Sequence, residues 1–360
     1  MIRSSIFLWI AAAWLPQVIA DDFAAQTRLN EIQVVGTHNS YHVEPHPSIL
    51  KIIRQVVPAQ AESIQYTHRP LPEQFSRLGI RQIELDIFAD PNGGHYAQPL
   101  AIELVENADL PAVPAPDPDK KLTQPGLKIL HVPDFDYATT VRTFVDALHQ
   151  VKKWSDAHPA HIPIMVLVEV KQEHISPLLK SPPPFDAAAM DSIDAEILSV
   201  FDASRIITPD SVRGTSPSLR AAVTVNGWPL LNDVRGKVMF ALDNGGAIRD
   251  LYLDGHETLQ NRVLFASVAA DHPAAAFVKV NDPVGRFKQI QSLVKRGFLV
   301  RTRADAATKE SRSGDTSRRD KALASGAQFV STDYPEPNKN FSDYSVQIPN
   351  IARRNPVIGR

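Results

Sequence analysis

The sequence IPIMVLVEV, residues 162–170, is the clearest indication of how this chain folds. An almost continuous apolar run of this length is typical of a strand that is buried on both faces, as strands are in a parallel sheet. Similar runs recur along the chain, and each is followed by a polar loop and then by helical periodicity. They occupy residues 32–36, 80–88, 127–131, 237–242, 263–267, 298–301 and 328–332.

Amphipathic stretches separate these predicted strands, and Gly79 and Gly297 stand where glycine commonly ends a helix. Eight strands that alternate with helices predict an α/β protein, a single (β/α)8 barrel with long loops on its catalytic face. A doubly wound open sheet is the alternative, but no Gly-x-Gly-x-x-Gly motif follows the first strand to support a dinucleotide site. The predicted helices cover residues 71–78, 141–154, 190–201, 284–294 and 315–326.

Composition and charge exclude several classes of protein. The chain has 360 residues, of which 43% are hydrophobic, and a formal net charge of −2. Because there is no basic excess, we expect no nucleic-acid partner, and nothing in the sequence indicates an obligate protein partner. The chain contains no cysteine, so disulfide bonds, thiolate catalysis and cysteine-ligated zinc are excluded.

The first twenty residues, MIRSSIFLWIAAAWLPQVIA, are typical of a secretory signal peptide, with a basic start, an apolar run and small residues at the cleavage site. We therefore expect a secreted or periplasmic protein whose barrel occupies residues 21–340 and whose C-terminal tail occupies residues 341–360. Two proline-rich stretches, residues 106–125 and 175–185, are interpreted as loops inserted into the barrel.

Polar side chains gather at the carboxyl ends of the predicted strands, where barrel enzymes build their active sites. Asp243 and Asn244 also follow a strand, but a lone Asp or Asn in this position is usually a turn or capping residue, and we interpret both in that way. The remaining candidates are His38, Asn39, Glu84, Asp86, His131, Glu169, Lys171, Arg303 and Asp333.

Glu84 and Asp86 are the most informative pair. They share one face of an apolar strand, where two buried carboxylates are costly unless a cation neutralises them. With Asn39 and Glu169 they form an all-oxygen donor set, which suits Ca2+ or Mg2+ better than zinc. Glu169 and Lys171 have the same spacing on another strand, so a plain ion pair is the alternative for those two.

Histidines and cations complete the predicted site. His38 and His131 would provide an acid and a base beside the metal ion. Lys171 and Arg303 offer positive charge to a phosphate group. The combination predicts metal-assisted attack on a phosphodiester.

Several segments resemble the calcium-dependent phosphoinositide-specific phospholipase C family of secreted bacterial and fungal enzymes. The resemblance extends from residue 30 to residue 335, and its order of His-Asn, Glu-x-Asp, His and Glu is also similar to that of the eukaryotic phosphoinositide phospholipases C. The segments are VVGTHNSYH (34–42), RQIELDIFAD (81–90), ILHVPDFDYAT (129–139), HIPIMVLVEVK (161–171), VRTRAD (300–305) and GAQFVSTDYP (326–335).

The resemblance implies calcium-dependent cleavage of phosphatidylinositol-type lipids to diacylglycerol and a cyclic or open inositol phosphate. It implies that His38 assists attack by the inositol 2-hydroxyl and that His131 protonates the leaving oxygen. Calcium, rather than magnesium, is the implied cofactor. The implied calcium ligands are Asn39, Glu84, Asp86 and Glu169, and the implied substrate contacts are Lys171, Arg303 and Asp333.

Several alternatives stay open. His95, in the turn NGGHY, is a rival for the second histidine by its spacing, and we prefer His131 because it ends a predicted strand. Glycerophosphodiester phosphodiesterases share the barrel, but they usually carry His-Arg-Gly after the first strand, where this chain has HNS at residues 38–40. The other alternative is an inactive barrel that binds inositol or a glycan.

A lipid substrate would also require transient contact with a membrane surface. Apolar residues at 49–57 and 178–185 are placed to supply it if the barrel is correct. The alternative is that both stretches pack as ordinary core-facing segments.

Overall fold

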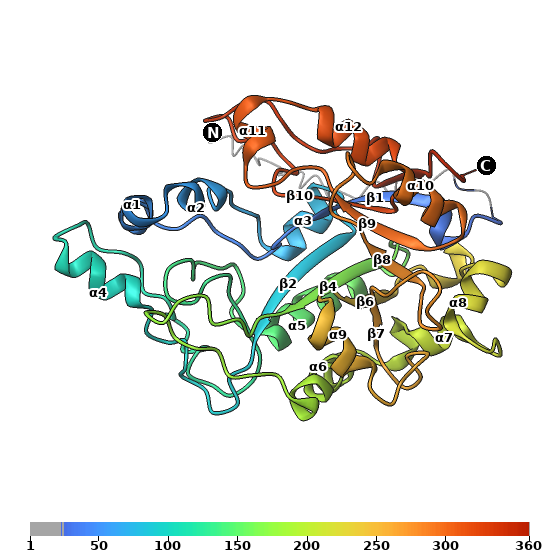
Figure 1. Cartoon of the computed structure of the whole chain (residues 1–360), viewed down its shortest axis with the longest axis horizontal. Coiled ribbons are helices and arrows are strands. Elements are labelled where there is room, and N and C mark those ends of the chain that lie inside the picture. The colour runs from blue at the N-terminus through green and yellow to red at the C-terminus, as the bar shows by residue number, and fades with distance from the viewer. Residues whose placement is uncertain (1–22, 24, 360) are drawn as a thin grey trace, which may run out of the picture.

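The structure of the chain, a computed structural model, describes residue 23 and residues 25–359, and the predicted signal peptide lies outside them. Within the described residues, eight parallel strands form a closed circuit (Figure 1). A single parallel bridge from Ser267 to Phe277 closes the circuit between β7 and β8. The predicted (β/α)8 barrel is therefore confirmed. In spatial order the strands are β1 (Ile32–Thr37), β2 (Gln82–Phe88), β4 (Ile164–Val170), β6 (Val238–Leu242), β7 (Leu264–Ala266), β8 (Phe277–Lys279), β9 (Leu299–Arg303) and β10 (Phe329–Thr332), which pairs with β1.

The barrel strand predicted at residues 127–131 is wrong. Only Lys128–Ile129 form a strand there, β3, and it runs antiparallel to the end of β2. The remaining barrel strand is β8, which at three residues is too short to produce a recognisable apolar run. Another short strand, β5 (Ile206–Ile207), pairs with the first residues of β6.

Helices surround the barrel, and local signals in the sequence set their ends (Figure 1). The side chains of Thr143 and Asp186 cap α5 and α6 by accepting backbone N–H groups. Gly79 and Gly297 adopt positive φ angles of 67° and 92°, as their predicted place after a helix requires. The helices are α1 (Pro47–Val56), α2 (Pro58–Ser63), α3 (Leu71–Arg77), α4 (Leu100–Asn107), α5 (Phe144–Ala157), α6 (Ala187–Val200), α7 (Pro209–Arg213), α8 (Leu219–Ala221), α9 (Gly246–Leu253), α10 (Phe287–Lys295), α11 (Lys309–Ser313) and α12 (Ser317–Ala324).

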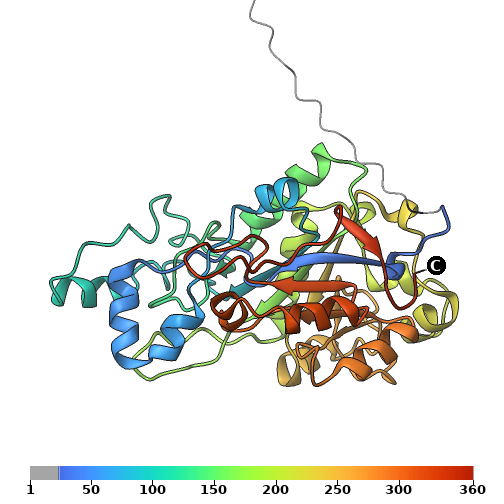
Figure 2. The same ribbon diagram turned by 90° about the horizontal axis from the view of Figure 1, so that it is seen from above.

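An outer lobe projects to one side of the barrel, formed by α1, α2, α4 and the loops at 108–127 and 171–186 (Figures 1 and 2). It has its own apolar cluster, in which Ile49, Leu50 and Ile53 of α1 are buried. These α1 residues therefore pack in the ordinary way. Because the lobe includes the segments that follow β1, β2 and β4, it lies beside the carboxyl ends of those strands.

The last residues of the chain pack against the barrel. Tyr344 and Val346 are buried, and β11 (Ala352–Arg354) runs antiparallel to the beginning of β1. Ala352 lies opposite Val34 in this pairing. Among the described residues, no helix has the length and apolar character needed to cross a bilayer.

Candidate active site

The barrel brings most of the predicted site residues together at the carboxyl ends of its strands. In the pairing of β2 with β4, Asp86 lies directly beside Glu169. Glu84 is two residues earlier on β2 and therefore faces the same side of the sheet. His38 follows β1, and Asp333 follows β10, its neighbour in the sheet.

His38 is held by Asp333 and Arg303. Its Nδ1 lies 2.7 Å from Asp333 Oδ1, and its Nε2 lies 3.1 Å from Arg303 Nη1. Burial and the neighbouring Arg303 lower the pKa of His38 to about 3, so the ring is neutral near pH 7. Burial raises the pKa of Asp333, but Arg303 and His38 outweigh it and hold that pKa well below its usual range. His38 therefore donates its Nδ1 proton to Asp333 and leaves Nε2 as an acceptor.

Three carboxylates form a compact cluster beside His38. One oxygen each of Glu84, Glu169 and Asp243 lies within 4.8 Å of the others, and we call these three side chains the oxygen cluster. Asp243 directly follows β6, and its interpretation as a plain turn residue missed this position. Its place after a barrel strand, on the neighbour of β4, is the signal that could have found it.

Buried oxygens next to this cluster lack hydrogen bonds. Among the described residues, Asn39 Oδ1 and Asp86 Oδ1 have no hydrogen-bond partner, while Asp86 Oδ2 faces the ammonium group of Lys171. Burial raises the pKa of Glu84 and that of Asp86, and the neighbouring carboxylates raise both further, whereas Arg301 and Lys171 lower them. Orphaned oxygens in an all-oxygen donor set are the environment that a Ca2+ ion requires, so these residues fit the predicted metal.

Cations of the chain already pair with these carboxylates. Lys171 Nζ lies 3.2 Å from Asp86 Oδ2 and 3.0 Å from Glu169 Oε2, which is the ion pair that the sequence left open. Arg301 pairs with Glu84, and Lys279 pairs with Asp243. Sequence analysis did not single out Lys279 as part of the site, because β8 itself was not predicted.

A second histidine cluster contains His131. Its Nδ1 lies 2.7 Å from Asp136 Oδ2, and His42 Nε2 lies 2.9 Å from both oxygens of the same carboxylate. Burial raises the pKa of Asp136, but His42 and His131 outweigh it and lower that pKa to about 2. His42 and Asp136 were missed by sequence analysis, since they are far apart in the chain.

The two candidates for the second histidine occupy different surroundings. The prediction that His131 ends a strand is wrong, because β3 ends at Ile129. His131 nevertheless has a buried carboxylate partner, whereas His95 Nε2 lies 3.0 Å from the backbone oxygen of Ser181 in the outer lobe. The geometry therefore favours His131.

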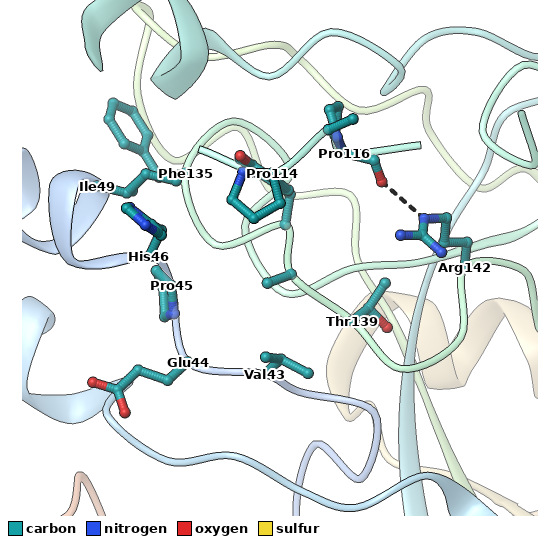
Figure 3. A pocket seen from close by; sticks show the side chains of 13 residues that line it. Val43, Glu44, Pro45, His46, Ile49, Pro114, Pro116, Phe135, Thr139 and Arg142 are labelled. Carbon is teal, nitrogen blue, oxygen red and sulfur yellow. Dashed lines mark hydrogen bonds between the residues drawn. The ribbon is translucent and has the colours of Figure 1, made fainter. Parts of the chain in front are cut away.

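Two pockets lie near these residues. One, of about 170 Å3, is lined by His131 and Lys171 together with Gln60, Ile175 and Leu179 of the outer lobe. The other, of about 270 Å3, has walls that include the residues labelled in Figure 3. We call the smaller pocket the opening, because its walls join His131 to Lys171, which pairs with Asp86 and Glu169.

Comparison with known proteins identifies the family. The family model described as "Phosphoinositide phospholipase C, Ca2+-dependent" matches residues 27–356. The chain belongs to this family. Its members are calcium-dependent phosphodiesterases, so this chain is an enzyme and calcium is its metal. The match favours the phospholipase over the glycerophosphodiesterase and over the inactive binding barrel.

Solved structures of similar fold agree with this assignment. A calcium-dependent phosphoinositol-specific phospholipase C from Pseudomonas sp., in a myoinositol complex, has 16% identity and a TM-score of 0.54, with 92% of this chain and 96% of that chain covered. A Ca2+-dependent phosphatidylinositol-specific phospholipase C from Streptomyces antibioticus has 16% identity and a TM-score of 0.50, with 86% and 95% covered. At these identities the likeness shows the fold. No curated protein matches the chain.

The placement of Asp243 generates a prediction about metal affinity. Asp243→Asn should weaken calcium binding about tenfold or more, because ligand charge sets the affinity of an oxygen site. Isothermal titration of the purified chain with calcium measures this change. Asp90→Asn is the matched control, since Asp90 is equally buried but pairs with Lys128. Unchanged affinity in Asp243→Asn would exclude Asp243 from the metal site.

Proposed function

We propose that this phospholipase C cleaves phosphatidylinositol-type lipids by attack of the inositol 2-hydroxyl on phosphorus. The products are diacylglycerol and a cyclic inositol phosphate, which water then opens. The observation that carries this proposal is the presence of two histidines, His38 and His131, each hydrogen-bonded to a buried carboxylate, with His38 Nε2 only 3.6 Å from Glu84 of the oxygen cluster.

His38 is proposed as the base. Its Nδ1 proton is held by Asp333, and its neutral ring presents Nε2 as an acceptor. The substrate hydroxyl would replace Arg303 at Nε2 and transfer its proton there as the oxygen attacks phosphorus. Arg303 also donates to Asp333, at 2.9 Å, so it stays beside the phosphate and stabilises the added negative charge.

His131 is proposed as the acid. Asp136 accepts a hydrogen bond from its Nδ1, so Nε2 is the ring nitrogen left for a substrate in the opening that His131 lines. As the bond between phosphorus and the glycerol oxygen breaks, His131 gives its Nε2 proton to that oxygen. Diacylglycerol then leaves with the proton, and His131 becomes neutral.

We propose that Asn39, Glu84, Asp86 and Glu169 hold the calcium ion, with Asp243 as a further ligand. When bound, the ion supplies positive charge that lowers the pKa of the 2-hydroxyl and offsets charge on the phosphate. Lys171 forms an ion pair with Glu169 and also lines the opening. Its ammonium group can therefore move from the carboxylate to a substrate phosphate.

A lipid surface is the proposed site of action. Ile175 and Leu178 are exposed on the outer lobe, at 66% and 83%, and Ile175 lines the opening beside His131. Gln60 of α2 lines the same opening, and Val56 at the end of α1 is 77% exposed. Apolar side chains around an active-site mouth favour shallow contact with a membrane. Export by the predicted signal peptide would place the enzyme in the periplasm or outside the cell.

The proposed reaction is tested with phosphatidylinositol vesicles, first with excess calcium and then with a chelator. We expect diacylglycerol and an inositol phosphate, identified by mass, and loss of both on chelation because the oxygen cluster needs its cation. If glycerophosphoinositol were cleaved and no diacylglycerol appeared, the chain would instead be a glycerophosphodiester phosphodiesterase.

Replacement of His131 tests its role as the acid. His131→Ala should lower kcat about 10²–10⁴-fold, the usual contribution of a general acid, while calcium affinity by titration stays unchanged. His95→Ala is the matched control and should retain turnover, because His95 bonds only to the outer-lobe backbone in this arrangement. Wild-type turnover in His131→Ala would remove His131 from the mechanism.

Replacement of Leu178, the exposed leucine of the outer lobe, tests the proposed membrane contact. Leu178→Ser should weaken binding to phosphatidylinositol vesicles roughly tenfold, since burial of a leucine is worth about 1.5–3 kcal/mol. Turnover of a water-soluble cyclic inositol phosphate should not change. Leu198→Ser is the control, because Leu198 is exposed on α6. Equal vesicle binding by both variants would contradict the proposed contact.

A further inference from the structure

His42, His131 and Asp136 form a second cluster of metal-ligating side chains in the described part of the chain. Each offers one ligand atom, and these atoms lie within 4.8 Å of one another. His131 and Asp136 flank a tight turn in which the backbones of Val132 and Asp136 pair. The cluster therefore rests on fixed backbone rather than on a loose loop.

The hydrogen bonds of His42 match those of a metal-bound histidine. Its Nδ1 lies 3.0 Å from the backbone oxygen of Tyr66, which can only accept, so Nδ1 carries a proton. Metal-ligating histidines usually donate their other ring N–H to a carbonyl or carboxylate in this way. Nε2, the remaining nitrogen, points at the two oxygens of Asp136. In the absence of a metal ion, a proton shared between Nε2 and the carboxylate holds this contact.

The donor set differs in kind from the oxygen cluster. Two imidazole nitrogens and one carboxylate oxygen suit zinc, which accepts three protein ligands and leaves a fourth position open. Calcium requires six or more oxygen ligands, so it is not expected here. His131 is 19% exposed, whereas His42 and Asp136 are buried, so an ion can enter from the side of His131.

We propose that His42, His131 and Asp136 form a zinc site, and that zinc bound there inhibits the enzyme. Zinc would replace the protons at His42 Nε2 and His131 Nδ1. The ring of His131 would then keep only its Nε2 proton, and loss of that proton would leave an imidazolate. It could no longer act as the acid, and this inhibitory effect rests on the proposed function of His131.

Tyr66 separates this site from the oxygen cluster. Its ring stacks on His42 with centroids 4.2 Å apart, and its hydroxyl accepts a hydrogen bond from Asn39 Nδ2 at 3.1 Å. The two sites therefore use different ligands, and calcium should not compete with zinc for the histidines.

The experiment uses Co2+ as a spectroscopic probe for zinc, added to the full chain in saturating calcium. We expect visible absorption bands of four-coordinate cobalt, which zinc then displaces, and loss of phosphatidylinositol cleavage as zinc is added. His131→Gln should remove the bands and weaken zinc binding about tenfold or more by titration. His42→Gln is a second ligand variant. His95→Gln, a histidine outside the cluster, should keep both the bands and the inhibition.

Different results would exclude the zinc site, its inhibitory role or the proposed function of the enzyme. Bands that persist in His131→Gln, or that calcium abolishes, would place the ion in the oxygen cluster and exclude the zinc site. Bands that depend on His131 without inhibition of an active enzyme would exclude the inhibitory role. A chain that shows the bands but never cleaves phosphatidylinositol would contradict the proposed function and leave the zinc site standing.

Discussion

The parallel register between β2 and β4 determines where the carboxylates of the candidate site come together. It sets Asp86 beside Glu169, while the alternation along β2 turns Glu84 to the same face. A slip of one residue would reverse the facing of β2 and move both of its carboxylates away from the site. The barrel circuit then adds His38, Asp243 and Asp333 from the ends of other strands. The site thus depends on one pairing that long apolar side chains fix from both faces.

Charge balance is the second constraint on this end of the barrel. Burying several carboxylates together is costly, and removal of one partner from such a set leaves an uncompensated charge. Three cations offset that cost by pairing with the oxygen cluster, namely Lys171, Arg301 and Lys279. The histidines are set differently: His38 is neutral with an ionised Asp333, whereas His42 faces acceptors on both of its nitrogens. The two histidine clusters therefore differ in their hydrogen bonding: His38 keeps one ring nitrogen as an acceptor, whereas His42 does not.

The sequence predicts the long buried strands well, because a continuous apolar run leaves few other interpretations. It fails for β8, where three residues carry no periodic signal, and for residues 127–131, whose apolar run is antiparallel to β2. Asp243 could not be separated from an ordinary turn residue by its type alone. The contact of His42 with Asp136 joins residues that no local pattern relates, so it required the three-dimensional structure.

The pairing of β11 with β1 has a consequence for how the chain folds. The first strand of the barrel finds its neighbours β10 and β11 only near the end of the chain, where Phe329 meets Val34 and Ala352 lies on the opposite edge. During synthesis the backbone N–H and C=O groups of β1 that pair with β10 and β11 therefore stay unpaired until almost the whole polypeptide has emerged. Contacts of such long sequence separation make folding slow and leave the nascent chain prone to association.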